Sequence, residues 1–85
     1  MSYHKNSVGV GSDLYSVDLK VSGIWAKLAL RLPSLQWIPC QTTNREFSHV
    51  KYLFKNYYKW DDLEVAQIVS VLETTLRWLD AQINH

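Results

Sequence analysis

The sequence predicts a small all-α domain of three helices, at about residues 13–32, 44–59 and 62–84. Apolar residues recur at helical spacing through most of the chain, which favours amphipathic helices over strands. The last two segments are separated by only two or three residues, and so short a link folds two helices into an antiparallel hairpin. Pro33 and Pro39 interrupt the chain between the first and second helices, because a residue before proline avoids the helical region.

The chain has 85 residues, which is the size of one domain. Its composition is 47% hydrophobic and 20% charged, with 3 Gly and 2 Pro, and this mixture excludes wholesale disorder. Residues 1–12 are polar and small and are expected to be a flexible N-terminal tail. Residues 13–85 are then a single helical domain.

The first segment supports two interpretations. One helical face collects the apolar residues Leu14, Val17, Val21, Ile24, Trp25, Leu28 and Leu32. Residues 15–22 also alternate strictly between apolar and polar, which is typical of a strand. We favour the helix, because the only other strand candidate is short and glycine-rich and an isolated hairpin is marginally stable. The alternative is an α+β fold with a β-hairpin at about residues 7–22 packed on the helical hairpin.

The two later segments carry signals for the start of a helix. Residues 43–46 match the S/T-x-x-E capping box, in which the first side chain and the fourth satisfy free amides at a helix N-terminus. Asp61 and Glu64 form a similar arrangement before the last helix, whose apolar stripe is Val65, Ile68, Val69, Leu72, Leu76, Leu79 and Ile83.

Charge and cysteine content limit the classes of function. The formal net charge is +1, so the chain as a whole has no strong attraction to nucleic acid or a membrane surface. One Cys excludes an internal disulfide framework and a Cys-rich zinc site. No signal peptide or membrane-spanning stretch is visible, so we expect a soluble, cytoplasmic protein with no membrane partner.

Catalytic and metal-binding patterns are weak. Cys40 and His49 are the best candidates for a thiolate–imidazole pair, but a lone Cys and a helix-surface His more often have structural roles. The other two His residues, His4 and His85, lie near the chain ends, and no His pair has metal-ligand spacing. We therefore expect no enzyme activity, no metal, no cofactor and no small-molecule substrate.

The aromatic content is the strongest indication of function. Four Trp and five Tyr are a large aromatic load for so short a chain, and Trp and Tyr are the residues that most often anchor interfaces. The expected interface residues are Trp25, Trp37, Val71, Thr75 and Trp78. The sequence thus predicts a non-enzymatic protein–protein interaction module, such as a small subunit, adaptor or inhibitor, whose partner is another protein chain, either a second copy or a different protein.

The alternative function is direct nucleic-acid binding by the middle helix. Lys51, Lys55 and Lys59 are spaced one turn apart and are called the lysine stripe below. With Arg45 and Tyr52 they would contact phosphates and stack on a base. So few cations predict only weak, salt-sensitive binding.

Overall fold

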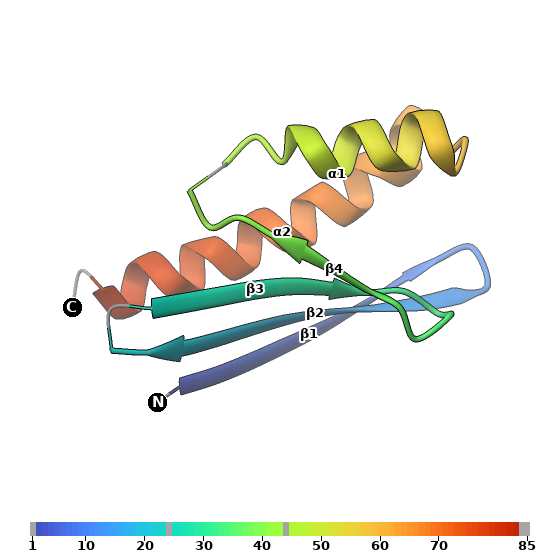
Figure 1. The fold of residues 1–85 in the computed structure, drawn as a ribbon. Coiled ribbons are helices and arrows are strands. Elements are labelled where there is room, and N and C mark those ends of the chain that lie inside the picture. The colour runs from blue at the N-terminus through green and yellow to red at the C-terminus, as the bar shows by residue number, and fades with distance from the viewer. Residues whose placement is uncertain (1, 24, 44, 84–85) are drawn as a thin grey trace.

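The computed structural model describes residues 2–23, 25–43 and 45–83 and shows an α+β fold. The elements in chain order are β1 (Ser2–Val10), β2 (Asp13–Ser22), β3 (Trp25–Arg31), β4 (Trp37–Cys40), α1 (Ser48–Tyr52), a π-helical turn η1 (Leu53–Tyr57) and α2 (Asp62–Ile83). The strands form one antiparallel sheet in the order β1-β2-β3-β4. Both helices pack on the same side of this sheet and run in opposite directions (Figure 1).

The predicted all-α class, with a helix over residues 13–32, is wrong. These residues form β2 and β3, joined at Gly23, whose φ of 61° suits a tight turn and not a helix. The alternation of apolar and polar residues in 15–22 is a true strand pattern, because the odd positions Tyr15, Val17 and Leu19 are buried and their neighbours are not. The molecule is therefore not a helical bundle.

The segment expected to be a flexible tail contains the first strand. β1 pairs with β2 without interruption from Ser2↔Val21 to Val10↔Asp13, and Gly11, with φ of 64°, makes the turn between them. Residue 1 lies outside the described residues. The alternative interpretation named the correct class, α+β, but its hairpin began at residue 7 and it lacked β3 and β4. β3 pairs with the side of β2 that faces away from β1, so β2 has a partner on each side and the hairpin is not isolated.

The helical half agrees better with the sequence. α2 spans Asp62–Ile83, as expected from its apolar stripe, while residue 84 lies outside the described residues. The middle helix begins at Ser48 instead of residue 44, because Phe47 adopts a left-handed conformation with φ of 52° and breaks the run. The capping box at 43–46 therefore caps no helix at Ser48, and its residue 44 is outside the described residues. Lys59, with φ of 60°, ends the segment before α2.

The capping box at α2 is confirmed, and it predicts a measurable contribution to stability. The Glu64 amide donates to Asp61 Oδ1 at 2.8 Å, and the Asp61 amide donates to Glu64 Oε1 at 3.3 Å. We expect Asp61→Ala to lower the free energy of unfolding by about 1 kcal/mol, because it leaves a helix amide without its acceptor. Urea denaturation measures the change. Gln67→Ala, at an exposed position inside α2, removes no capping group and should cost less; an equal loss in both variants would contradict the capping role.

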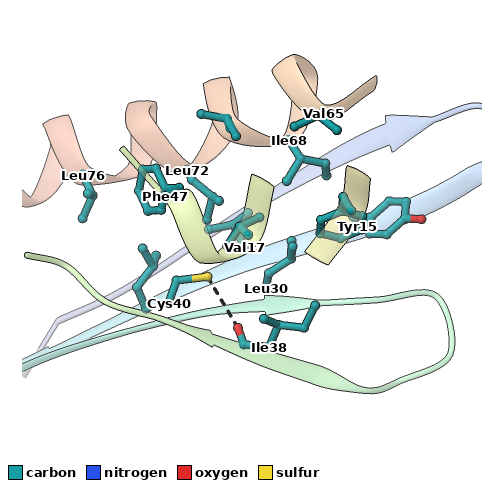
Figure 2. Close-up of a cluster of buried hydrophobic side chains, with 14 of the residues drawn as sticks. Tyr15, Val17, Leu30, Ile38, Cys40, Phe47, Val65, Ile68, Leu72 and Leu76 are labelled. Atoms are coloured by element: carbon teal, nitrogen blue, oxygen red, sulfur yellow. Dashed lines mark hydrogen bonds between the residues drawn. The ribbon is translucent and has the colours of Figure 1, made fainter. Parts of the chain in front are cut away.

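The core lies between the sheet and the helices (Figure 2). Val17 and Leu30 from the sheet, Phe47 from the connection and Leu72 from α2 are each 2% exposed or less. Figure 2 shows these side chains meeting in the space between the sheet and α2. No helix in the described part of the chain is long and apolar enough to cross a bilayer.

Candidate functional site

The side of the sheet that faces away from the helices carries no layer of chain over it in the described residues (Figure 1). Successive side chains of a strand point to opposite sides, so the neighbours of the buried positions point to this side. We call it the open face. Its residues are Tyr3, Lys5, Ser7, Gly9, Leu14, Ser16, Asp18, Lys20, Ser22, Trp25, Lys27, Ala29, Arg31, Trp37 and Pro39.

Strand register arranges the open face in rows that cross the sheet. One row places Lys20 between Tyr3 and Lys27, because Lys20 pairs with both. Two rows further along, Arg31 of β3 pairs with Trp37 of β4. The open face thus carries aromatic side chains on β1, β3 and β4 and cationic side chains on β1, β2 and β3.

Three aromatic side chains of the open face are accessible. Trp25 is 78% exposed, Tyr3 56% and Trp37 44%. Burying a Trp side chain stabilises a fold because it removes a large apolar area from water. Two exposed Trp side chains do not make this contribution to the free energy of folding. Trp25 and Trp37 are separated by the length of β3 and one strand spacing, about 20 Å. The aromatic groups therefore mark out an extended site instead of one compact patch.

The cations of the open face outnumber its carboxylates, and Asp18 stands opposite only one of them on β1, Lys5. The face has four cations, Lys5, Lys20, Lys27 and Arg31, and one carboxylate, Asp18, a balance of +3. In the described residues, none of the four forms an ion pair with a carboxylate. Lys20 and Lys27 stand directly opposite each other, an arrangement that destabilises a sheet. An anionic ligand between them would relieve this repulsion.

Two open-face aromatics are held in place by polar neighbours. The Tyr3 hydroxyl donates to Asp18 Oδ2 at 2.8 Å, and this hydrogen bond raises the pKa of the Tyr3 phenol above its ordinary value. The Arg31 guanidinium lies 5.8 Å from the centre of the Trp37 ring, within cation–π range. The other Asp18 oxygen, Oδ1, is buried without a hydrogen-bond partner among the described residues. Asp18 therefore holds the Tyr3 ring and supplies the one negative charge of the open face.

A shallow depression of about 540 Å³ lies on the open face. It is lined by Tyr3, Asp18, Lys20, Lys27, Ala29, Trp37 and Pro39. The small side chain of Ala29 and the flat ring of Pro39 pair across β3 and β4 at its floor. The depression combines an apolar floor with cationic and aromatic walls, which suits a ligand that is both planar and anionic.

The chain matches no protein-family model, no curated protein and no solved structure. The function is therefore inferred from the residues of the site and their chemistry.

The five expected interface residues fall in two places. Trp25 and Trp37 lie on the open face, on β3 and β4. Val71, Thr75 and Trp78 lie instead on α2 and pack inside the molecule: Thr75 is fully buried, and Val71 and Trp78 lie against the core. The rings of Trp78 and His4 stack 4.5 Å apart, and the Asn6 amide donates to Thr75 Oγ1 at 3.1 Å. Thr75 and Trp78 of α2 thus contact β1, a strand that the sequence interpretation did not include.

Two of the five expected phosphate-contacting residues, Lys55 and Arg45, form ion pairs with carboxylates. The Lys55 ammonium pairs with Asp62 at 2.6 Å. Arg45 forms two hydrogen bonds with the Asp80 carboxylate, at 3.0 and 3.3 Å. Lys51 lines a groove with Asp62 and Glu73. Lys59 follows η1 and has a left-handed backbone conformation. Tyr52 is exposed on α1. Lys55 and Arg45 are therefore less available to an anionic ligand than the cations of the open face.

The candidate pair of Cys40 and His49 lacks an activated thiol. Both line a depression of about 420 Å³ between β4 and α1. Burial raises the pKa of the Cys40 thiol to about 11, and its sulfur donates to the Ile38 carbonyl at 3.5 Å. A catalytic cysteine needs a lowered pKa, so this thiol is protonated at neutral pH and is a poor nucleophile. No group of three or more His, Cys, Asp or Glu with metal-binding geometry occurs in residues 2–23, 25–43 and 45–83.

Sequence reasoning missed the basic half of the open face. A helix over residues 13–32 would carry Lys20, Lys27 and Arg31 on the face opposite its apolar residues. Only the strand register shows that Lys20 and Lys27 are opposite each other and that Arg31 faces Trp37. The alternation in residues 15–22 was the available signal, and it was outweighed by the missing partner strands.

Proposed function

We propose that this protein is a non-enzymatic binding module whose open face takes single-stranded nucleic acid. The main support for this proposal is that three accessible aromatic rings share the open face with four cations, none of which forms an ion pair with a carboxylate in the described residues. Phosphates need cations, and unpaired bases need flat apolar surfaces on which to stack. A cytoplasmic location, as expected from the sequence, is compatible with this ligand.

A single strand fits this surface better than a duplex. Stacking on Tyr3, Trp25 and Trp37 requires bases whose planes are free, and a duplex hides those planes between neighbouring pairs. Four-stranded sheets with exposed aromatic side chains are a known platform for unpaired RNA bases. The 20 Å span between Trp25 and Trp37, estimated from strand geometry, accommodates a short extended run of nucleotides.

The depression defines the central contact of the proposed site. Lys20 and Lys27 would bind one phosphate between them, and binding would remove their mutual repulsion. Tyr3, held by Asp18 at one end of this row, would stack on the adjoining base. Arg31 and Trp37 form a second cation–aromatic pair further along the strand.

The test compares charge reversals on the two basic surfaces of the molecule. A fluorescein-labelled oligonucleotide is titrated with the full chain at several salt concentrations, and fluorescence anisotropy gives Kd. We expect the double substitution Lys20→Glu/Lys27→Glu to weaken binding by at least about tenfold and to reduce the salt dependence, because two phosphate-contacting charges are lost. Asp18→Asn is expected to tighten binding, since it removes the one carboxylate of the face.

The matched control is Lys51→Glu/Lys59→Glu, which makes the same change in net charge on the helical side. If binding depended only on net charge, both double variants would weaken it equally, and the open-face site would be refuted. Loss of binding in the control alone would move the site to the lysine stripe. An unaltered chain that binds no oligonucleotide at low salt would also overturn the proposal and favour a protein ligand for this face. Circular dichroism checks that every variant is folded.

A further inference from the structure

The outer edge of β1 is a second unusual feature. β1 is the first strand in the sheet order, so only β2 pairs with it, and in the described part of the chain no backbone hydrogen bond reaches its other side. The register with β2 runs without a bulge over nine residues, and Lys5 is the only residue of β1 with a permanent charge. Long, regular edges of this kind are ready to pair with another strand.

The other edge of the sheet is protected. β4 has only four residues, and one of them is Pro39, which cannot donate to a further strand. Short edges and edge prolines are the usual devices that prevent sheet-to-sheet association. The molecule therefore blocks one edge and leaves the other open, which points to a partner strand at β1.

The turn fixes which backbone groups of β1 face outward. Val10 and Asp13 pair across the two turn residues Gly11 and Ser12. This pair must be of the hydrogen-bonded kind, because otherwise the two turn residues would have to bond to each other. The kinds alternate along an antiparallel ladder, so the N–H and C=O groups of the odd residues point to the free edge. These residues are Tyr3, Lys5, Ser7 and Gly9, which also carry the side chains of the open face.

We propose that β1 pairs antiparallel with β1 of a second copy, about a two-fold axis at Asn6. This register opposes Tyr3 to Gly9 of the other copy and Lys5 to Ser7 of the other copy, and it uses every outward-facing group from residue 3 to residue 9. Shifting the axis to Lys5 would oppose two lysines, which destabilises a sheet, and shifting it to Ser7 would leave Tyr3 unpaired. An aromatic ring opposite glycine is a favourable cross-strand pair. The strand is thus complementary to itself in one register.

The helical side of β1 accepts the same partner. His4 and Val8 point toward the helices, and the proposed register places each beside the other across the axis. Val8 and Trp78 are only partly buried within one copy, so pairing would cover apolar surface left accessible there. The two sheets would join into one of eight strands with their open faces on the same side. The dimer is inferred from the edge alone and does not depend on the proposed ligand.

Opposite charges at residue 7 test this register. Within one copy Ser7 lies opposite Ser16, so a charge at 7 meets no charge directly across β2. In the dimer residue 7 meets Lys5 of the other copy twice, by symmetry. We expect Ser7→Glu to tighten the dimerisation Kd by about tenfold and Ser7→Lys to weaken it by about tenfold, as measured by sedimentation equilibrium of the full chain. Equal effects, or effects of the reverse sign, would contradict the Asn6-centred register.

A proline at the same position tests the edge itself. The Ser7 N–H points away from β2, so Ser7→Pro removes a group that the fold of one copy does not use. We expect this variant to sediment as a monomer at concentrations where the unaltered chain and Ser7→Ala are dimers, with the same circular dichroism spectrum. A dimer that survives Ser7→Pro, or an unaltered chain that stays monomeric at high concentration, would overturn the proposal.

Discussion

Replacing Phe54 by alanine is expected to lower the free energy of unfolding by about 3–5 kcal/mol, because the ring is removed from the centre of an aromatic cluster. Phe54 is 1% exposed. Its ring centre lies 4.2 Å from that of Trp60, 5.2 Å from that of Tyr58 and 6.3 Å from that of Tyr15. The cluster joins η1 to β2 and to the chain entering α2. Its loss would therefore weaken the contact between the helical half and the sheet.

Urea denaturation followed by circular dichroism measures this effect. Domains of this size have total stabilities of about 5–15 kcal/mol, so a loss of this magnitude leaves a substantial unfolded fraction near room temperature in the less stable case. Tyr52→Ala is the matched control, because Tyr52 is an aromatic residue of the same helical segment and is 68% exposed. We expect it to change stability by less than about 0.5 kcal/mol. A similar small change for Phe54→Ala would show that the cluster is not part of the stabilising core.

The helical half could be predicted because its signals are local. The apolar stripe of α2 and the Asp61–Glu64 capping box lie within a few residues of each other, and both are present in the structure. The start of α1 could not be predicted in the same way. Phe47 takes a left-handed conformation while its ring is buried at 2% exposure, so its tertiary packing outweighs the local capping pattern at residues 43–46.

The sheet could not be predicted because its partners are distant or weakly marked. Val17, Val21 and Leu28 fit a helical face as well as a strand pattern, and the choice depends on whether neighbouring strands exist. β1 contains glycine and few apolar residues, and its inward-facing positions His4 and Asn6 are polar. They are accommodated by Trp78 and Thr75 of α2, a contact across about seventy residues of chain that no local pattern indicates.

The candidate site could be predicted only in part, because its arrangement depends on the sheet. The aromatic surplus correctly drew attention to Trp25 and Trp37, which are accessible, although their role as interface residues stays a prediction. Of the other aromatic residues, Tyr15 is buried in the core and Trp60 and Trp78 pack against it, while Tyr3, Tyr52 and Tyr57 are exposed. Only the strand register shows which cations lie beside the exposed rings. The sequence pattern therefore indicated the lysine stripe and gave no sign that Lys20 and Lys27 lie side by side.

The buried thiol of Cys40 predicts a loss of stability in alkaline solution. Burial raises its pKa from the ordinary value of 9.0 to about 11 in the folded protein, with a smaller opposing effect from the Leu30 backbone. The folded state therefore holds the proton more tightly than the unfolded state. Between pH 9 and pH 11 the unfolded chain binds fewer protons, so the free energy of unfolding falls as pH rises through this window and is fully retained below it. We expect the thiol to account for about 1–2 kcal/mol of that loss, allowing for partial solvent screening.

The alanine variant isolates this effect from the other groups that titrate in alkali. Burial also raises the pKa of Tyr15, and tyrosines and lysines lose protons in the same range, so the absolute pH dependence of the protein has several sources. Cys40→Ala keeps all of those groups and removes only the thiol. Urea denaturation of both chains at pH 9 and pH 11 should show a steeper decline in the unaltered protein. Identical declines would mean that the Cys40 sulfur is reached by water, and that β4 is less tightly packed against Phe47 than its burial indicates.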